Sequence, residues 1–263
     1  AIRLASTQLD LFDLKLGKFY ERGIFYDDFP DQLLESSQIH RQMAQKLIAH
    51  QEGRVELSDS QVLLDQVNQA CEKMVAQIGE RSQQLLDQGK LVGVIGGDHS
   101  TPLGLLRSLD QRVGQAGFGI LHFDAHADLR DAYQGFKHSH ASIMQNALND
   151  CSNLNKIVSV GLRDLAESEH RKLESDSRLI GFYDSLLKEQ QFIGKSWDQI
   201  SEGIVRELPD QVYVSFDIDG LDPIYTPSTG TVENDGLSLE DGKYIVQSLI
   251  KTQNLKAFDL VEY

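Results

Sequence analysis

Residues 119–128 read GILHFDAHAD, an apolar run followed by polar side chains at every second position. The run 119–123 is short and nearly continuous, which is typical of a strand buried on both faces. Alternate side chains of an extended segment point the same way, so Asp124, His126 and Asp128 are expected to face one cavity. The stretch therefore predicts a buried strand with potential ligands at its carboxyl end.

Other apolar runs of the same character predict the rest of a sheet. The expected strands are residues 91–95, 119–123, 156–160, 179–182, 212–216 and 255–260, and helical patterns cover residues 58–86 and 239–250. Alternating strands and helices indicate a parallel sheet covered on both faces, with ligands bound outside the carboxyl ends of the strands. We predict an α/β fold, a three-layer α/β/α arrangement with a mainly parallel central sheet, forming one domain over residues 1–263.

Two further motifs lie at the ends of predicted strands. Residues 96–100 read GGDHS and residues 215–220 read SFDIDG, where Asp217 and Asp219 repeat the alternate spacing. The three motifs supply six candidate metal ligands, which are His99, Asp124, His126, Asp128, Asp217 and Asp219. Carboxylates and imidazoles without thiolates suit Mn²⁺ better than structural zinc, and six ligands fit two ions about 3.5 to 4 Å apart. The sequence predicts two Mn²⁺ per chain, with a bridging water as the nucleophile.

The three motifs, in this order, resemble those of the ureohydrolase family of arginase, agmatinase and formimidoylglutamase. The resemblance covers residues 91–263 and implies the arginase-like α/β/α fold. It also implies that His99 and Asp128 hold one manganese ion, that His126 and Asp219 hold the other, and that Asp124 and Asp217 bridge them. Relatives continue past the position of Tyr263 into another helix, so we expect the C-terminal end to be truncated here.

A histidine pair follows the second motif in residues 138–142, HSHAS. Histidine titrates near neutral pH and suits proton transfer to a leaving amine. The resemblance favours His140 as this catalytic proton shuttle, because Ala141 matches the small residue that follows the family's histidine. His138 stays open as the alternative. His122, inside a predicted strand, is expected to be a hydrogen-bonded core residue.

Three residues are candidates for binding the substrate. Glu262 resembles the family's glutamate that pairs with the guanidinium, and a carboxylate can grip that planar cation in a bidentate manner. Thr231 resembles a threonine beside the substrate, although Val232 follows it where the family has proline. Arg130 stands where arginases have asparagine, and at this position the sequence resembles formimidoylglutamases. Arg130 is expected to hold a substrate carboxylate, or else to pair with Asp131 at the surface.

These features predict a metal-dependent hydrolase of linear amidines. The expected reaction cleaves a C–N bond of a guanidino compound and releases urea and an amine, with Asp128 orienting the water and His140 and Glu262 completing the catalytic set. A formimidoylglutamase, which releases formamide and glutamate, is the first alternative. Two further alternatives are a mononuclear zinc deacetylase and a metal-binding scaffold without turnover. Metal stoichiometry would identify the first, and a substrate panel would identify the second.

Composition limits the partners that can be expected. Asp and Glu number 40 against 25 Lys and Arg, a formal charge of −15, which argues against nucleic acid or an anionic membrane. Cys71 and Cys151 lack a CxxC spacing, so a reducing cytoplasmic setting is expected. No signal peptide or membrane-spanning apolar run is recognisable. The expected partners are a small guanidino or formimino substrate and, from the resemblance, further copies of the chain.

Overall fold

The computed structural model describes residues 5–27 and 30–263 and divides the chain into two compact units, Ala1–Gln42 and Met43–Tyr263. The first unit contains a short 3-10 helix, η1, at Phe19–Arg22 and the start of helix α2, which covers Asp31–Gln51. The second unit contains the sheet and all the candidate site residues. The prediction of a single domain over residues 1–263 stays a prediction.

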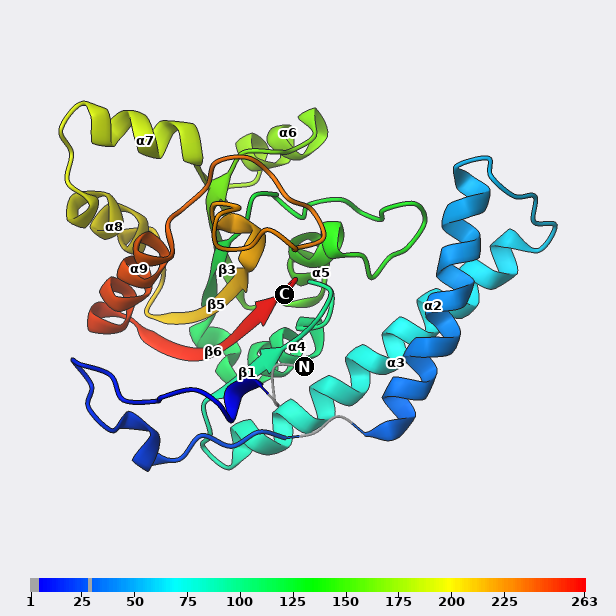
Figure 1. The fold of residues 1–263 in the computed structure, drawn as a ribbon, viewed down its shortest axis with the longest axis horizontal. Helices are drawn as coiled ribbons and strands as arrows, with labels where there is room; N and C mark the ends of the chain where they lie inside the picture. The colour runs from blue at the N-terminus through cyan, green and yellow to red at the C-terminus, as the bar shows by residue number, and fades with distance from the viewer. Residues whose placement is uncertain (1–4, 28–29) are drawn as a thin grey trace. The chain divides into compact units, whose positions relative to one another are not determined.

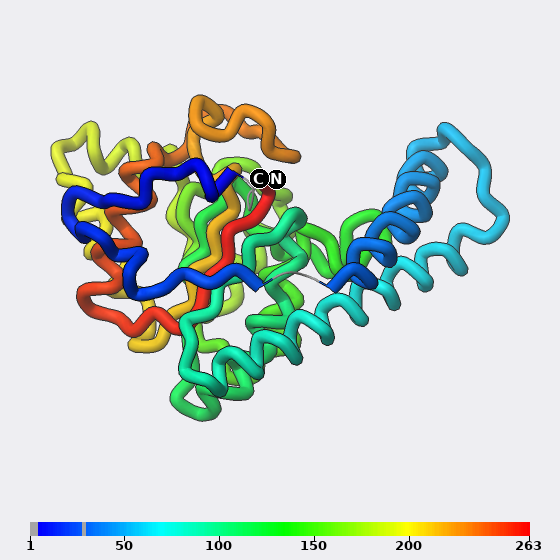
Figure 2. Tube along the Cα trace, turned by 60° about the horizontal axis from the view of Figure 1, so that its bottom comes forward, coloured from blue at the N-terminus to red at the C-terminus, as the bar shows by residue number. Residues whose placement is uncertain are grey.

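A six-stranded sheet forms the centre of the second unit, in the order β1-β6-β5-β2-β3-β4. Its strands are β1 (Val92–Ile95), β2 (Phe118–Phe123), β3 (Leu154–Leu162), β4 (Leu179–Tyr183), β5 (Gln211–Asp217) and β6 (Asn254–Val261). Every pairing in this sheet is parallel. Both views show β6 passing between β1 and β5 (Figures 1 and 2). The α/β prediction is confirmed, because each predicted strand is present and the sheet is parallel.

Helices cover both faces of this sheet. They are α3 (Ser60–Asp87), α4 (Leu103–Val113), α5 (Ile143–Asp150), α6 (Glu167–Ser175), α7 (Asp184–Phe192), α8 (Trp197–Arg206) and α9 (Leu239–Thr252). Short 3-10 helices lie at Gly114–Ala116 (η2), His140–Ser142 (η3) and Ile218–Gly220 (η4). One buried cluster joins α3, α4 and α5 to the sheet, and a second joins α7, α8 and α9 to its other face. In the described part of the chain, every helix is too short or too polar to cross a bilayer.

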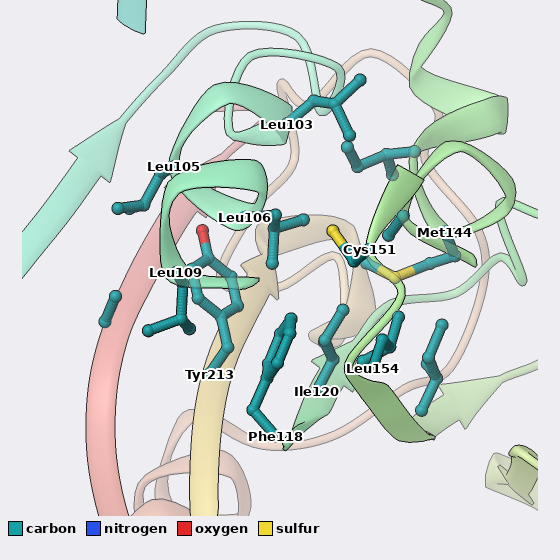
Figure 3. Close-up of a cluster of buried hydrophobic side chains, with 14 of the residues drawn as sticks. Leu103, Leu105, Leu106, Leu109, Phe118, Ile120, Met144, Cys151, Leu154 and Tyr213 are labelled. Atoms are coloured by element: carbon teal, nitrogen blue, oxygen red, sulfur yellow. The ribbon is translucent and has the colours of Figure 1, made fainter. Parts of the chain in front are cut away.

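A fully buried part of the core lies beneath α4. Leu105, Leu106 and Leu109 lie over Phe118 and Tyr213 of the sheet, all at most 1% exposed (Figure 3). Burying several large side chains contributes about 1.5 to 3 kcal/mol each. Because this packing fixes α4 against the strand ends, the GGDHS segment that leads into the helix is held in a defined place.

Candidate active site

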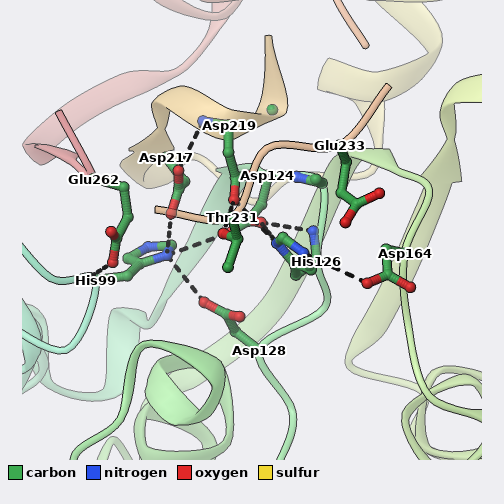
Figure 4. Close-up of polar contacts among 12 residues, drawn as sticks. His99, Asp124, His126, Asp128, Asp164, Asp217, Asp219, Thr231, Glu233 and Glu262 are labelled. Carbon is green, nitrogen blue, oxygen red and sulfur yellow. Dashed lines mark hydrogen bonds and ion pairs between the residues drawn. The ribbon is translucent and has the colours of Figure 1, made fainter. Parts of the chain in front are cut away.

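One buried imidazole lies at the centre of three carboxylates. His99 Nδ1 is 2.9 Å from Asp128 Oδ2, 3.1 Å from Asp124 Oδ2 and 3.2 Å from Asp217 Oδ2. These side chains come from the ends of three different strands (Figure 4). His99 is fully buried, and each carboxylate side chain is at most 5% exposed. The first three motifs of the sequence therefore meet in space as predicted.

A second group of candidate ligands adjoins the first and shares Asp124 with it. His126 Nδ1 lies 3.1 Å from Asp219 Oδ2 and 3.3 Å from Asp124 Oδ1. The two oxygens of Asp124 thus face different histidines, Oδ2 toward His99 and Oδ1 toward His126. Asp219 is tied to this group through its other oxygen, which accepts a 3.0 Å hydrogen bond from the Ala125 amide. This arrangement fits two neighbouring cations with Asp124 between them.

The charges and hydrogen bonds fit metal ions at this place. Burial by itself lowers the pKa of His99, yet the three carboxylates that face its Nδ1 raise it well above its ordinary value. Burial likewise opposes the charged form of His126, but the hydrogen bonds to Asp124 and Asp219 raise its pKa to about 11. Burial, followed by the charge of Asp124, raises the pKa of Asp217 well above its usual range. Buried carboxylates crowded in this way require positive charge, which divalent cations supply.

The donor geometry supports the same conclusion. Although three carboxylate oxygens lie within 3.2 Å of His99 Nδ1, none is placed to make a well-directed hydrogen bond with it among the described residues. A single N–H can point at one oxygen only, whereas a cation can be shared by all of these donors. Among the described residues, three groups of potential ligands adjoin one another here. They are His99, His122, Asp124 and Asp128; Asp124, His126 and Asp219; and His126, Asp164 and Glu233.

The local backbone structure explains how the motifs converge. It also differs from the extended conformation that their alternate spacing predicts. Asp128 follows β2 with a φ of 55°, so the segment 124–128 is not extended throughout as its spacing suggests. Asp219 lies in η4, where Asp217 Oδ1 accepts its amide at 2.8 Å, so the expected alternation at Asp217 and Asp219 is wrong. Asp217 ends β5, and the 3-10 turn that follows brings Asp219 beside it.

A close backbone approach joins the second and third motifs. A Cβ on Gly220 would lie 2.7 Å from the Asp124 amide nitrogen, closer than real Cβ atoms come to backbone. Only glycine allows η4 to lie directly against the end of β2 here. The glycine that closes the SFDIDG motif is therefore needed for the packing of one ligand segment on the other.

Glu262 lies at the end of β6 beside His99. Its Oε1 accepts the His99 amide at 2.9 Å, and its own amide donates to the Gly97 carbonyl at 2.6 Å. Its φ of 61° lies in the left-handed region, which is strained for a non-glycine residue. The structure thus brings Glu262 to the edge of the ligand cluster (Figure 4). Burial, then the charge of Asp98, raises its pKa.

Thr231 also reaches the centre, because its hydroxyl donates to Asp219 Oδ2 at 2.8 Å. The loop that carries it is held by Arg163, whose guanidinium donates to backbone carbonyls. Arg163 donates to Asp219 at 2.6 Å, to Asn234 at 2.9 Å and to Glu233 at 3.1 Å. We call this set of hydrogen bonds from Arg163 the clamp, and the sequence motifs did not predict it. An arginine immediately after a buried strand was its only signal.

The two candidate histidines of the HSHAS segment have different neighbours. His140 Nδ1 lies 3.6 Å from Asp98 Oδ2, and Asp98 directly precedes the ligand His99. The Asp98 carboxylate is the largest influence on the pKa of His140 and raises it. His138 Nε2 instead lies 3.0 Å from Glu72 Oε2 on α3, in a nearly buried position. The structure therefore brings His140 to the edge of the ligand cluster and uses His138 to attach the loop to a helix.

The guanidinium of Arg130 contacts Glu169 and Tyr133. Its Nε lies 3.6 Å from Glu169 Oε2, and its Cζ lies 5.1 Å from the ring centre of Tyr133. The Tyr133 ring in turn meets His140 edge-on, with ring centres 5.7 Å apart. Arg130 thus meets Glu169, while Asp131, the alternative partner, lies 3.0 Å from the Lys172 ammonium. Arg130, Tyr133 and His140 thus form one row of contacts beside the ligand cluster.

His122 has the hydrogen bonds expected of a core histidine. Its Nδ1 lies 3.0 Å from Ser159 Oγ and its Nε2 lies 2.9 Å from Asp124 Oδ2. It is fully buried and therefore supports Asp124 from inside the sheet. Its position within a strand gave no indication that it would touch a ligand.

Comparisons with known proteins agree with this geometry. A family model described as the arginase family matches residues 26–263. The N(1)-aminopropylagmatine ureohydrolase of Synechocystis sp. is 27% identical, over 73% of this chain and 60% of its own length. The guanidinobutyrase of Pseudomonas aeruginosa is 32% identical, over 70% of this chain and 56% of its own.

A solved structure shows the same similarity in three dimensions. The agmatine ureohydrolase of Thermoplasma volcanium superimposes with a TM-score of 0.59 at 27% identity, over 73% of this chain and 61% of that one. The chain spans less than two thirds of the length of these relatives.

Proposed function

This chain belongs to the arginase family, and from that premise we propose that it is a metal-dependent hydrolase of linear guanidino compounds. The proposed reaction cleaves a C–N bond and releases urea and an amine. The observation that carries it is the convergence of three carboxylates within 3.2 Å of one nitrogen of His99. The ureohydrolase and guanidinobutyrase names of the relatives support a guanidino substrate.

The proposed cofactor is a pair of Mn²⁺ ions. His99 and Asp128 would hold one, His126 and Asp219 the other, and Asp124 and Asp217 both. When bound, the ions would lower the pKa of a water molecule and offset negative charge that develops on the substrate. The split of the two Asp124 oxygens between His99 and His126 supports its role as a bridge.

The side chains around this centre have complementary proposed roles. Asp128 accepts a hydrogen bond from the attacking water and orients it toward the sp² carbon of the substrate. Glu262 pairs with the guanidinium, and Thr231 lies beside it through its bond to Asp219. His140 delivers a proton to the leaving amine, for which its contact with Asp98 keeps it in place. Water attack and amine departure thus use separate groups.

The surroundings of Arg130 favour formimidoylglutamase as a second candidate. Within the described residues, its terminal nitrogens make no hydrogen bond or ion pair, while Glu169 and Tyr133 hold the rest of the guanidinium. Two free N–H groups on a positioned guanidinium can bind a carboxylate in a bidentate manner. An acidic substrate such as formimidoylglutamate, arginine or guanidinobutyrate would use them, whereas agmatine would not.

The proposed setting is the cytoplasm, with small-molecule substrates and further copies of the chain as partners. Two free thiols, Cys71 and Cys151, support a reducing compartment. The formal charge of −15 makes nucleic acid an unfavourable partner.

A substrate panel tests the proposed function. The purified chain is loaded with Mn²⁺ and its metal content is measured by mass spectrometry, with about two ions per chain expected. Urea release is then measured with agmatine, arginine and guanidinobutyrate, and formamide release with formimidoylglutamate. Asp124→Asn serves as the matched control for background hydrolysis. Bound metal without turnover of any of the four would support a non-catalytic scaffold and contradict the proposal.

A further inference from the structure

A carboxylate is buried behind His99, and among the described residues no lysine or arginine pairs with it. Asp259 of β6 is 1% exposed. It accepts hydrogen bonds from the Tyr213 hydroxyl at 2.6 Å, the Ser215 hydroxyl at 3.1 Å and the Phe216 amide at 3.2 Å. These donors all lie on the neighbouring strand β5, where Ser215 stands opposite Asp259 in the parallel register. Such a buried charge is costly, so its retention needs a reason beyond packing.

The hydrogen bonds continue from Asp259 to the candidate ligand. His99 Nε2 lies 2.9 Å from Ser215 Oγ, and both residues are fully buried. A backbone amide can only donate, so Asp259 Oδ1 acts as an acceptor toward Phe216 and is available to accept from Ser215 as well. Ser215 has one proton to give, and it goes to Asp259. Its oxygen then accepts a hydrogen bond from the Nε2–H of His99.

This order of donors determines which nitrogen of the imidazole can bind a cation. With hydrogen on Nε2, the lone pair available to a cation is on Nδ1, the atom that faces Asp124, Asp128 and Asp217. The Ser215 side chain that contacts the ring is itself held by its 3.1 Å hydrogen bond to Asp259 on the adjacent paired strand. Metal-binding histidines depend on partners of this kind for orientation and basicity.

We propose that Ser215, Asp259 and Tyr213 form a hydrogen-bonded relay that positions His99 for metal binding. The relay rests on the proposed metal centre and assigns these three residues as positioning residues within it. Tyr213 acts at the far end by holding Asp259 Oδ2, which keeps Oδ1 toward Ser215. Loss of such a partner typically weakens metal affinity by about 10–100-fold.

Calorimetric titration of the metal-free chain with Mn²⁺ tests the relay. Ser215→Ala removes both hydrogen bonds of the serine and is expected to weaken one of the two manganese sites by about 10–100-fold. Ser201→Ala is the matched control, because Ser201 is another fully buried serine, on α8, whose hydroxyl makes no hydrogen bond in the described structure. Asp259→Asn in the Ser215→Ala background is expected to add little further loss, because both changes break the same relay.

A second measurement keeps the relay separate from the proposed function. In metal-free protein labelled with ¹⁵N-histidine, His99 is expected to show a hydrogen-bonded Nε2–H signal that shifts in Ser215→Ala and stays in place in Ser201→Ala. An unchanged signal, or unchanged affinity for both ions in folded Ser215→Ala protein, overturns the relay. Failure of the parent chain to bind two Mn²⁺ overturns the metal centre instead, and the ring signal still decides whether His99 is held as described.

Discussion

Arg163 offers the sharpest test of how the site is held together. Its guanidinium donates to the carbonyls of Asp219, Asn234 and Glu233, and more weakly to Gly161, Gly220 and Leu221. One cation therefore joins η4 to the loop that carries Thr231. Arg163→Ala removes all of these bonds and leaves several carbonyls without their donor.

The expected cost follows from the three shortest bonds, at 2.6, 2.9 and 3.1 Å. A hydrogen bond to a charged group contributes about 1.5–3 kcal/mol. The three are not additive, and water can reach part of the vacated space, so we expect Arg163→Ala to lower the free energy of unfolding by about 3 kcal/mol. For a chain of this size, that corresponds to a fall in Tm of roughly 6–12 °C.

Thermal unfolding of the metal-free protein measures this effect. Arg163→Lys is the matched control, since an ammonium group keeps the charge but cannot reach as many carbonyls as the planar guanidinium. Its Tm is expected to lie between those of the parent and Arg163→Ala. A Tm for Arg163→Ala within about 2 °C of the parent would show that the clamp does not stabilise the loops, and the reasoning would be refuted.

Three further predictions concern other parts of the molecule. Arg130→Ala is expected to raise KM for the best acidic substrate by about 10–150-fold, which corresponds to about 1.5–3 kcal/mol for a lost charge-assisted hydrogen bond, and to leave KM for agmatine unchanged. If the parent and the variant have equal KM values for the acidic substrate, Arg130 does not bind its carboxylate. Asp124→Asn is expected to lose both bound manganese and activity, as measured by metal content and urea release; full occupancy would mean that Asp124 is not the bridge. Burial, followed by the charges of Asp110 and Asp150, raises the pKa of Cys151 from 9.0 to about 12. Between these two pKa values the folded state keeps a proton that the unfolded chain loses. The free energy of unfolding is therefore expected to fall as the pH rises from about 9 to about 12, and to be lower by about 1.4 kcal/mol at pH 10 than below pH 9. Denaturant unfolding at pH 8 and pH 10 is expected to show a loss that is larger in the parent than in Cys151→Ala by about this amount; equal losses in the two proteins would contradict it.

The strands could be predicted from the sequence because a strand buried on both faces is a short, nearly continuous run of apolar residues. Residues 119–123 are apolar apart from one histidine, and all of β2 is buried. The six strands form at the predicted positions for this reason. Helix α2 has no comparable mark, since a single residue in it, Leu47, is buried. A helix that buries so little has no clear apolar stripe to identify it.

The candidate site was predictable where neighbouring residues in a motif act together. His99, Asp124 and His126 meet because parallel strands place their carboxyl ends at one edge. Contacts made across the fold could not be predicted from the motifs. The pairing of Arg130 with Glu169 depends on where α6 lies, and the bond between Ser215 and Asp259 depends on the register of two strands. A short motif contains neither kind of information.

The central place of β6 has a consequence for the order of assembly. Within the described residues, β1 pairs with β6 alone, so the strand that leads to His99 can join the sheet only after a segment more than 150 residues further along has docked. Contacts between such distant segments form slowly, because a long loop must close first. The six candidate ligands therefore come together only after nearly the whole described chain has folded, and a nascent chain lacking residues 254–261 would hold an incomplete site.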